Sequence, residues 1–300
     1  MAGFTIDLAG RVKNFDLPKT QPLIPLFEAV VNSIYAIEER MEHEDFKGKI
    51  DIRIIREPQE IAPVEGINSS INEIIGFSIS DNGIGLDDNN MKSFLQSDST
   101  YRAEKGGKGV GRFSWLKAFD NTKITSIYKD DDTWVKREFE FSIDKLDIDD
   151  SLKEVEERDY CTTVELIDYK PVYRKHVGKS PEVIATKIMQ HCMIYLMSPN
   201  CPIISVIDDE RYCINDMFEK RIKREDNPID FVVGTEKFSL VNAKIQDASV
   251  AGSKIYLYAN DRMVKPVNLD KTLVDLDKNI YDDKGFYYCL LYTSPSPRDA

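Results

Sequence analysis

Apolar residues recur at helical spacing in one stretch near the start of the chain. Between residues 26 and 40 they lie three and four positions apart, as on a helix with one buried face: Phe27, Val30, Val31 and Ile34. A polar run over residues 38–47 then returns the chain to the surface. The pattern predicts an amphipathic helix over residues 26–40.

Alternating or continuous apolar runs predict strands on both sides of this helix. The predicted strands are 4–8, 50–55, 74–80, 123–128, 134–141, 162–167, 203–207, 211–214, 231–254 and 255–259. Helical spacing returns at 112–119 and 181–197. Helices combined with mostly antiparallel strands predict an α/β two-layer sandwich rather than an alternating parallel sheet. The charged stretch 219–227 is predicted to separate this sandwich from a second unit.

Composition agrees with a folded protein of about two domains. The chain has 300 residues, of which 42% are hydrophobic and 31% charged, which excludes wholesale disorder and a membrane bundle. The net charge is −12, so the chain as a whole is not drawn to nucleic acid or anionic lipid. No apolar run reaches membrane-spanning length and no secretory signal is evident, so we expect a cytoplasmic location. The five cysteines contain no CxxC pair and are expected to be reduced.

The last residues stand apart from the rest of the chain. Residues 289–299 read CLLYTSPSPRD, which resembles the translation of a transposon-type sequencing-library adapter. We therefore interpret 289–300 as an adapter-derived tail and exclude it from fold reasoning. The predicted organisation is a domain over 1–218, a partial second domain over 226–288, and this tail.

Glu28 and Asn32 place a carboxylate and an amide one turn apart on the predicted helix. Such pairs also occur on ordinary solvated helix faces. The small residues Ala29, Ser33 and Ala36 around them leave room for a ligand to lie against the helix.

A short motif, Asp81-Asn82-Gly83-Ile84-Gly85, follows an apolar strand. One interpretation is a hairpin turn, since Asn-Gly is a strong turn signal. The functional alternative is that Asp81 accepts a hydrogen bond from an exocyclic amino group, while the glycines let a flat ring approach the backbone.

A glycine-rich loop, residues 106–112, leads into a predicted helix. Exposed backbone N–H groups and a helix start together favour phosphate. The loop fits neither a Rossmann motif, because no strand precedes it, nor a Walker A motif, because Gly109 follows Lys108. A flexible loop without function is the alternative. Farther along, Thr162 and Thr163 open a strand, a common place for threonine.

Taken in order, these four features resemble the GHKL ATPase superfamily, which includes gyrase, Hsp90, histidine kinases and MutL. The resemblance covers residues from about 23 to 168 and implies a Bergerat ATP-binding fold. It implies Glu28 as the general base, Asn32 as the Mg²⁺ ligand, Asp81 as the adenine contact, and Thr162 as its support. Gly83 and Gly85 would shape the adenine pocket. The implied phosphate loop comprises Gly107, Lys108, Gly109, Val110, Gly111 and Arg112.

The sequence departs from this pattern at two positions. Cys161 stands where many members have glycine, and Tyr35 stands where MutL-like and Hsp90-like members often have aspartate. Residues 170–207 and 256–267 also resemble MutL, which implies the start of a ribosomal S5-type transducer domain. In such transducers a lysine often reaches the terminal phosphate, and Lys244, Lys254 and Lys265 are all candidates here.

The resemblance implies a Mg²⁺-dependent ATPase that works as a switch or clamp. Residues 97–111 would close over ATP, the transducer would dock, and two subunits would meet as a homodimer. Mismatch repair, chaperone action and bacterial defence all use such a domain, and whether DNA is a partner stays open. The alternatives are an ATP-sensing interaction module without hydrolysis and a histidine kinase. The latter needs a phosphoacceptor helix before the domain, and the residues before Leu26 contain no histidine.

Overall fold

The structure is a computed structural model, and its description is restricted to part of the chain. The described residues are 8–58, 72–96, 111–143, 150–224, 228–245, 254–259, 262–269 and 287–294. They divide into two compact units. The first comprises the described residues up to Ala185 together with Asn200–Cys213, and the second comprises Thr186–Pro199 and the described residues from Ile214 onward.

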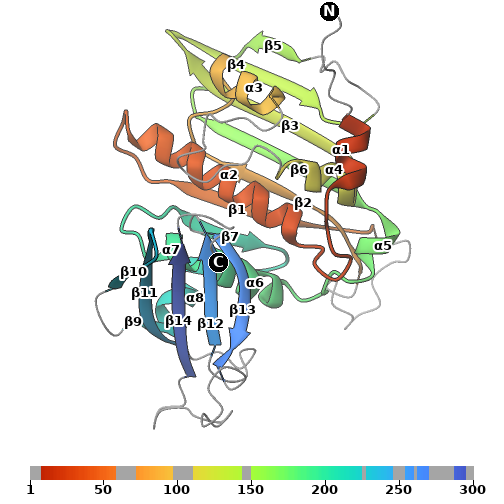
Figure 1. Cartoon of the computed structure of the whole chain (residues 1–300). Coiled ribbons are helices and arrows are strands. Elements are labelled where there is room, and N and C mark those ends of the chain that lie inside the picture. Colours follow the sequence, from red (N-terminus) through yellow and green to blue (C-terminus); the bar gives the residue numbers. More distant parts are fainter. Residues whose placement is uncertain are drawn as a thin grey trace, which may run out of the picture. The chain divides into compact units, whose positions relative to one another are not determined.

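A mixed eight-stranded sheet forms the framework of the first unit, with strand order β5-β4-β3-β6-β2-β1-β7-β8 (Figure 1). Only the β1–β7 pair is parallel, so the sheet is mostly antiparallel, as predicted. The strands are β1 (Lys49–Arg56), β2 (Ile74–Asp81), β3 (Phe119–Asp130), β4 (Thr133–Glu140), β5 (Ser151–Glu154), β6 (Cys161–Tyr169), β7 (Ile203–Ile207) and β8 (Arg211–Cys213).

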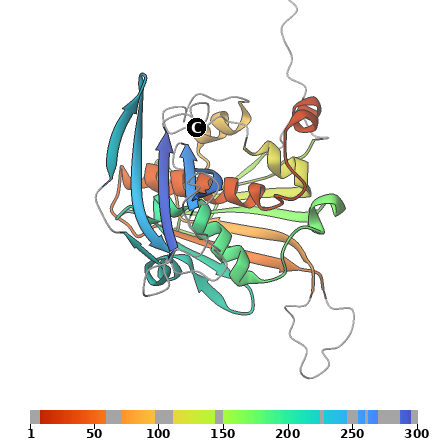
Figure 2. The same cartoon turned by 60° about the horizontal axis from the view of Figure 1, so that its bottom comes forward.

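Helices α2 (Ile24–Met41) and α4 (Phe113–Ala118) pack against strands of this sheet. The unit also contains α1 (Leu8–Asn14), α3 (Asp88–Leu95), α5 (Pro171–Arg174) and the start of α6 (Pro181–His191). The turned view shows α2 lying against β1 and β2 (Figure 2). Fully buried residues meet between these layers: Leu26, Val30, Ile34 and Ile37 from α2, and Ile50, Ile52, Phe77 and Ile79 from the strands. Burying each such side chain stabilises the fold by about 1.5–3 kcal/mol.

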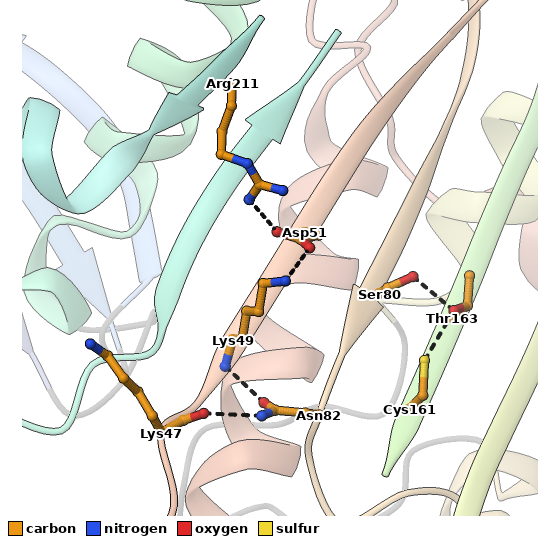
Figure 3. A network of polar contacts seen from close by, with 8 residues as sticks. All are labelled: Lys47, Lys49, Asp51, Ser80, Asn82, Cys161, Thr163 and Arg211. Atoms are coloured by element: carbon orange, nitrogen blue, oxygen red, sulfur yellow. Dashed lines mark hydrogen bonds and ion pairs between the residues drawn. The ribbon is translucent and has the colours of Figure 1, made fainter. Parts of the chain in front are cut away.

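The other face of the sheet is polar. One row of mostly polar residues crosses all eight strands in register: Cys213, Ser205, Asp51, Ser80, Thr163, Thr125, Glu138 and Ser151. Hydrogen bonds and ion pairs link parts of this face, including Ser80 with Thr163 and Asp51 with both Lys49 and Arg211 (Figure 3). An antiparallel sheet with one apolar and one polar face buries its core on the helix side alone.

Several elements of the structure differ from the prediction. The strand predicted over 231–254 is interrupted, because strands Ile229–Val233 and Glu236–Ile245 pair with each other, and strand Ser151–Glu154 was not predicted. Leu8 begins helix α1 rather than ending a strand, and residues 4–7 lie outside the described part. The helix predicted over 181–197 is divided at Cys192, so that α6 is followed by the short helix α7 (Met193–Leu196). Helix α3 was not predicted, because its eight residues contain few apolar positions and bury only Asn90 and Met91.

The second unit contains a six-stranded sheet with order β10-β11-β14-β12-β13, and β9 also pairs with β11. Its strands are β9 (Ile222–Arg224), β10 (Ile229–Val233), β11 (Glu236–Ile245), β12 (Lys254–Ala259), β13 (Arg262–Asn268) and β14 (Tyr287–Ser294), and α8 is Ile214–Arg221. The Tyr258 hydroxyl donates to the Gln190 carbonyl at 2.7 Å, which ties this sheet to the end of α6.

Two sequence interpretations concern this second unit. The charged stretch 219–227 predicted as a boundary contains the end of α8 and strand β9, which pairs with β11. Residues 289–294, interpreted as adapter-derived, continue β14 and pair with β11 and β12, and Leu291 is fully buried. The adapter origin of these residues stays a prediction.

Candidate functional site

One ridge of helix α2 has a repeat of four residues and carries Glu28, Asn32, Ala36 and Arg40, of which all but Ala36 are polar. Glu28 and Asn32 are half-buried. The helix begins with Pro25 in its first turn, and the Trp115 indole donates to the Pro25 carbonyl at 3.0 Å, which fixes α4 beside it. The predicted helix and the shared face of Glu28 and Asn32 are therefore confirmed.

Asp81 ends β2 beside this ridge and is 6% exposed. The Ser33 hydroxyl donates to its Oδ2 at 2.7 Å, and the Gly83 amide donates to its Oδ1 at 2.9 Å. Two uncharged donors thus contact the two oxygens of the carboxylate. The sequence analysis noted Ser33 only as a small residue, and its contact with Asp81 was missed.

The two glycines after Asp81 allow close approaches that no side chain would permit. A Cβ on Gly83 would lie 2.6 Å from the Ala36 carbonyl carbon, and the next residue, Ile84, donates its amide to the Ala36 oxygen at 2.9 Å. Gly85 has a φ of +90°, and a Cβ there would lie 2.5 Å from the Tyr128 Cβ. The chain continues into α3 instead of pairing back on β2, so the hairpin interpretation of this motif is wrong.

Thr162 lies opposite Asp81 in the β2–β6 register and is 8% exposed. Its hydroxyl lies 2.8 Å from the Ser126 hydroxyl, and Ser126 accepts the Leu86 amide at 2.9 Å. Thr162 therefore contacts the far side of the Asp81–Gly85 turn through Ser126. The role expected for Thr162, support of Asp81, stays a prediction.

The segment after the turn is fixed by Arg137, whose side chain is 5% exposed. It donates to the Leu86 carbonyl at 2.8 Å and to the Asp88 carboxylate at 2.6 Å. This hydrogen bond holds the pKa of Asp88 below its usual range. Sequence reasoning missed Arg137, because these two partners are about fifty residues away.

Gly111 brings the end of the glycine-rich loop to Glu28. A Cβ on Gly111 would lie only 2.1 Å from Glu28 Oε2, so this position must lack a side chain for Glu28 to keep its place. The neighbouring Arg112 donates to the Gln96 carbonyl at 2.8 Å, and its guanidinium lies over the Phe94 ring at 5.2 Å. Gly107, Lys108, Gly109 and Val110, with the rest of the predicted closing segment up to residue 110, lie outside the described residues.

The two departures from the family pattern are explained differently. Tyr35 is 4% exposed and belongs to the buried part of α2. Cys161 lies at the start of β6 on the polar face, where its Sγ is 3.8 Å from the Thr163 hydroxyl (Figure 3). Lys244, Lys254 and Lys265 lie on β11, β12 and β13 of the second unit, and the expectation that one of them reaches a phosphate stays a prediction.

Among the residues that the structure describes, no three His, Cys, Asp or Glu side chains group as a metal site. A site with Asn32 as one oxygen ligand suits Mg²⁺, which commonly keeps several waters and binds through substrate phosphates. Asn32 thus fits a metal that arrives with a nucleotide.

No family model matches the chain, and a comparison with curated proteins found no match. No helix in the described part of the chain is long and apolar enough to span a membrane.

Proposed function

We propose that the first unit is a Bergerat-type domain of the GHKL class that binds ATP with Mg²⁺ and hydrolyses it. One observation carries this proposal: a single face of α2 meets both the Asp81–Gly85 turn and Gly111. The Asp81 carboxylate proposed to contact adenine, the Glu28 carboxylate proposed to orient water, and the end of the glycine-rich loop are thereby brought to one helix. The order of these features along the chain, from Glu28 to Thr162, resembles that of the GHKL superfamily and supports the same assignment.

Adenine recognition is assigned to Asp81. Its carboxylate accepts hydrogen bonds only, which suits the exocyclic amino group of adenine. Ser33 and the Gly83 amide hold the carboxylate in place before the ligand arrives, so little ordering is needed on binding. Gly83 and Gly85 keep side chains away from the backbone that the flat ring would approach.

Hydrolysis is assigned to Glu28. Its carboxylate orients a water for in-line attack on the terminal phosphorus and takes the proton as the new P–O bond forms and the bond to the ADP oxygen breaks. Mg²⁺, held by Asn32 and the phosphates, supplies charge neutralisation when bound. The backbone of residues 107–111 is proposed to donate to the phosphates. In this proposal the second unit is a transducer, and ATP binding favours a homodimer that acts as a switch or clamp.

The test measures ATP binding by calorimetry and steady-state phosphate release for the wild type and Glu28→Ala. We expect the variant to bind ATP within about twofold of the wild type and to release phosphate at least about 100-fold more slowly, as for loss of a general base. Glu42→Ala, at an exposed position just after α2, is the matched control and should behave as wild type.

Two results would contradict the proposal. A wild-type chain that binds no ATP would exclude the whole assignment. Glu28→Ala hydrolysing ATP at the wild-type rate would show that Glu28 is not the base. Binding without phosphate release in the wild type would favour the ATP-sensing module instead.

A further inference from the structure

Arg40, in the last turn of α2, is an arginine whose side chain is only 12% exposed. Its guanidinium lies between two aromatic rings, 3.9 Å from the centroid of Phe46 and 4.0 Å from that of Tyr160. Cation–π contacts on both faces hold the planar group in one orientation. Burial raises the pKa of the Tyr160 hydroxyl, which therefore stays neutral beside it.

The edges of the same guanidinium are also engaged. One terminal nitrogen donates to the Asn82 backbone carbonyl at 2.7 Å, and Nε donates to the Glu44 carboxylate at 2.7 Å. Glu44 is 43% exposed, so this ion pair stabilises little. The bond to Asn82 is part-buried and joins α2 to the residue directly after Asp81.

The Asn82 side chain is held from the opposite direction by β1. Its Oδ1 accepts the Lys49 amide at 2.7 Å, and its Nδ2 donates to the Lys47 carbonyl at 3.0 Å (Figure 3). The Asn82 amide also donates to the Lys49 carbonyl at 3.3 Å. Residue 82 is thus fixed by its side chain to the start of β1 and by its carbonyl to α2.

The carbonyl that Arg40 contacts belongs to the peptide unit that supplies the Gly83 amide. That amide donates to Asp81 Oδ1 at 2.9 Å. Arg40, the Asn82–Gly83 peptide and Asp81 therefore form one chain of hydrogen bonds, in which a charged donor polarises the peptide toward the carboxylate. Rotation of this peptide would remove the donor from Asp81.

We propose that Arg40 is a positioning residue for adenine recognition, acting on Asp81 through the Asn82–Gly83 peptide. This inference rests on the proposed function, because it assumes that Asp81 reads the adenine ring. Lysine cannot replace Arg40 in this role, since it lacks the planar group that stacks between two rings while donating along its edge.

The experiment compares the affinity of Arg40→Lys and the wild type for ATP, adenosine and inorganic tripolyphosphate. Both adenine ligands should bind roughly fivefold to twentyfold more weakly to the variant, by about the same factor. Tripolyphosphate, which lacks the ring, should bind to the variant and to the wild type with the same affinity, measured as its inhibition constant in competition with ATP. A merely structural role would weaken all three ligands together.

Matched variants separate the contacts of the guanidinium. Glu44→Gln removes only the exposed ion pair and should change the affinity for ATP by less than about twofold. Tyr160→Phe keeps the ring and should match the wild type, whereas Tyr160→Leu removes one wall of the sandwich and should reproduce part of the Arg40→Lys loss. These variants also serve if Arg40→Lys does not fold.

A double-mutant cycle with Asp81→Asn tests the route of action. If Arg40 acts through Asp81, Arg40→Lys adds less than about twofold to the loss already caused by Asp81→Asn. Additive losses, or an unchanged affinity of Arg40→Lys for ATP and adenosine, would overturn the inference while leaving the proposed function intact. A wild-type chain that binds neither adenine ligand would overturn both.

Discussion

A buried carboxylate from another part of the chain lies beside each end of strand β1, and the two carboxylates are held in different ways. At its C-terminal end, Arg56 and Asp208 form an ion pair with side chains that are 10% and 8% exposed. Arg56 Nε and a terminal nitrogen both donate to this carboxylate, at distances from 2.6 to 3.1 Å. Nearby, Arg174 pairs with Glu57 and with Glu73.

At its N-terminal end, Ile50 lies opposite Asp81. The Asp81 carboxylate there accepts hydrogen bonds from a hydroxyl and a backbone amide, both uncharged. The arginine at this end, Arg40, donates to a peptide carbonyl beside Asp81.

The difference separates a carboxylate paired with an arginine from one whose oxygens accept from a hydroxyl and a backbone amide. An arginine that pairs directly with a carboxylate neutralises it, so the Arg56 end ties loops together. An open pocket of about 460 Å³ beside it is lined by these same groups, including Arg56, Glu57 and Asp208. Neutral donors position the Asp81 carboxylate, which suits the role proposed for it as the hydrogen-bond acceptor for adenine.

The largest expected effect concerns the Arg56 end. Arg56→Met leaves Asp208 buried without this arginine and should lower the free energy of unfolding by about 3–5 kcal/mol. In the absence of urea, where it remains folded, the variant should bind ATP with wild-type affinity. Urea unfolding and calorimetry measure the two quantities. Arg53→Met, at an exposed position on the same strand, is the control. A loss of ATP affinity equal to that of an Asp81 variant would remove the distinction between the two ends.

The next effect concerns Gly83. A Cβ at this position meets backbone atoms of α2, so Gly83→Ala must displace the turn from the helix. We expect about a tenfold loss of ATP affinity and a loss of roughly 1–3 kcal/mol in the free energy of unfolding. Gly178→Ala is the matched control, because nothing lies within 4 Å of a Cβ there. Equal behaviour of the two variants would contradict the close approach at Gly83.

A smaller effect is expected at Ser33. Ser33→Ala removes the donor to Asp81 Oδ2 and should cost about 1–2 kcal/mol of stability, with an ATP affinity roughly fivefold lower. Ser78→Ala, half-buried on the polar face of β2, should change neither. An unchanged ATP affinity for Ser33→Ala would show that the hydroxyl does not prepare the carboxylate.

The smallest effect is a pH dependence at Arg40. Its hydrogen bond lowers the pKa of Glu44 below the ordinary 4.5. A lowered folded-state pKa gives stability that is present above about pH 4.5 and is lost as the pH falls through the folded-state value. Unfolding at pH values across this window should show a shallower acid-side decline for Glu44→Gln than for the wild type. Parallel curves of stability against pH for the two proteins would mean that the Arg40–Glu44 ion pair adds nothing to the free energy of unfolding.

The sequence predicted what depends on local pattern. Helix α2, the strands of the first sheet other than β5, and the ridge with Glu28 and Asn32 follow from periodicity, and they are confirmed. Helix α1 was missed because a few apolar residues fit a strand or a helix equally well.

Contacts between distant residues could not be predicted in this way. Ser33 and Asp81 are 48 residues apart, Arg40 and Asn82 are 42 apart, and Arg56 and Asp208 are 152 apart. Each contact depends on which strands become neighbours, and a single sequence does not state that order. Asn82 did carry a signal, the Asp-Asn-Gly motif, but the pattern fitted a hairpin as well as the turn that the fold contains.

The most direct test of the central claim is the affinity of Asp81→Asn for Mg·ATP, measured by calorimetry beside the wild type. The amide replaces one acceptor oxygen with a donor, which cannot receive the amino hydrogen of adenine. We expect the wild type to bind Mg·ATP and Asp81→Asn to bind it at least about tenfold more weakly while remaining folded. Equal affinity of the two proteins, or no binding by the wild type, would contradict it.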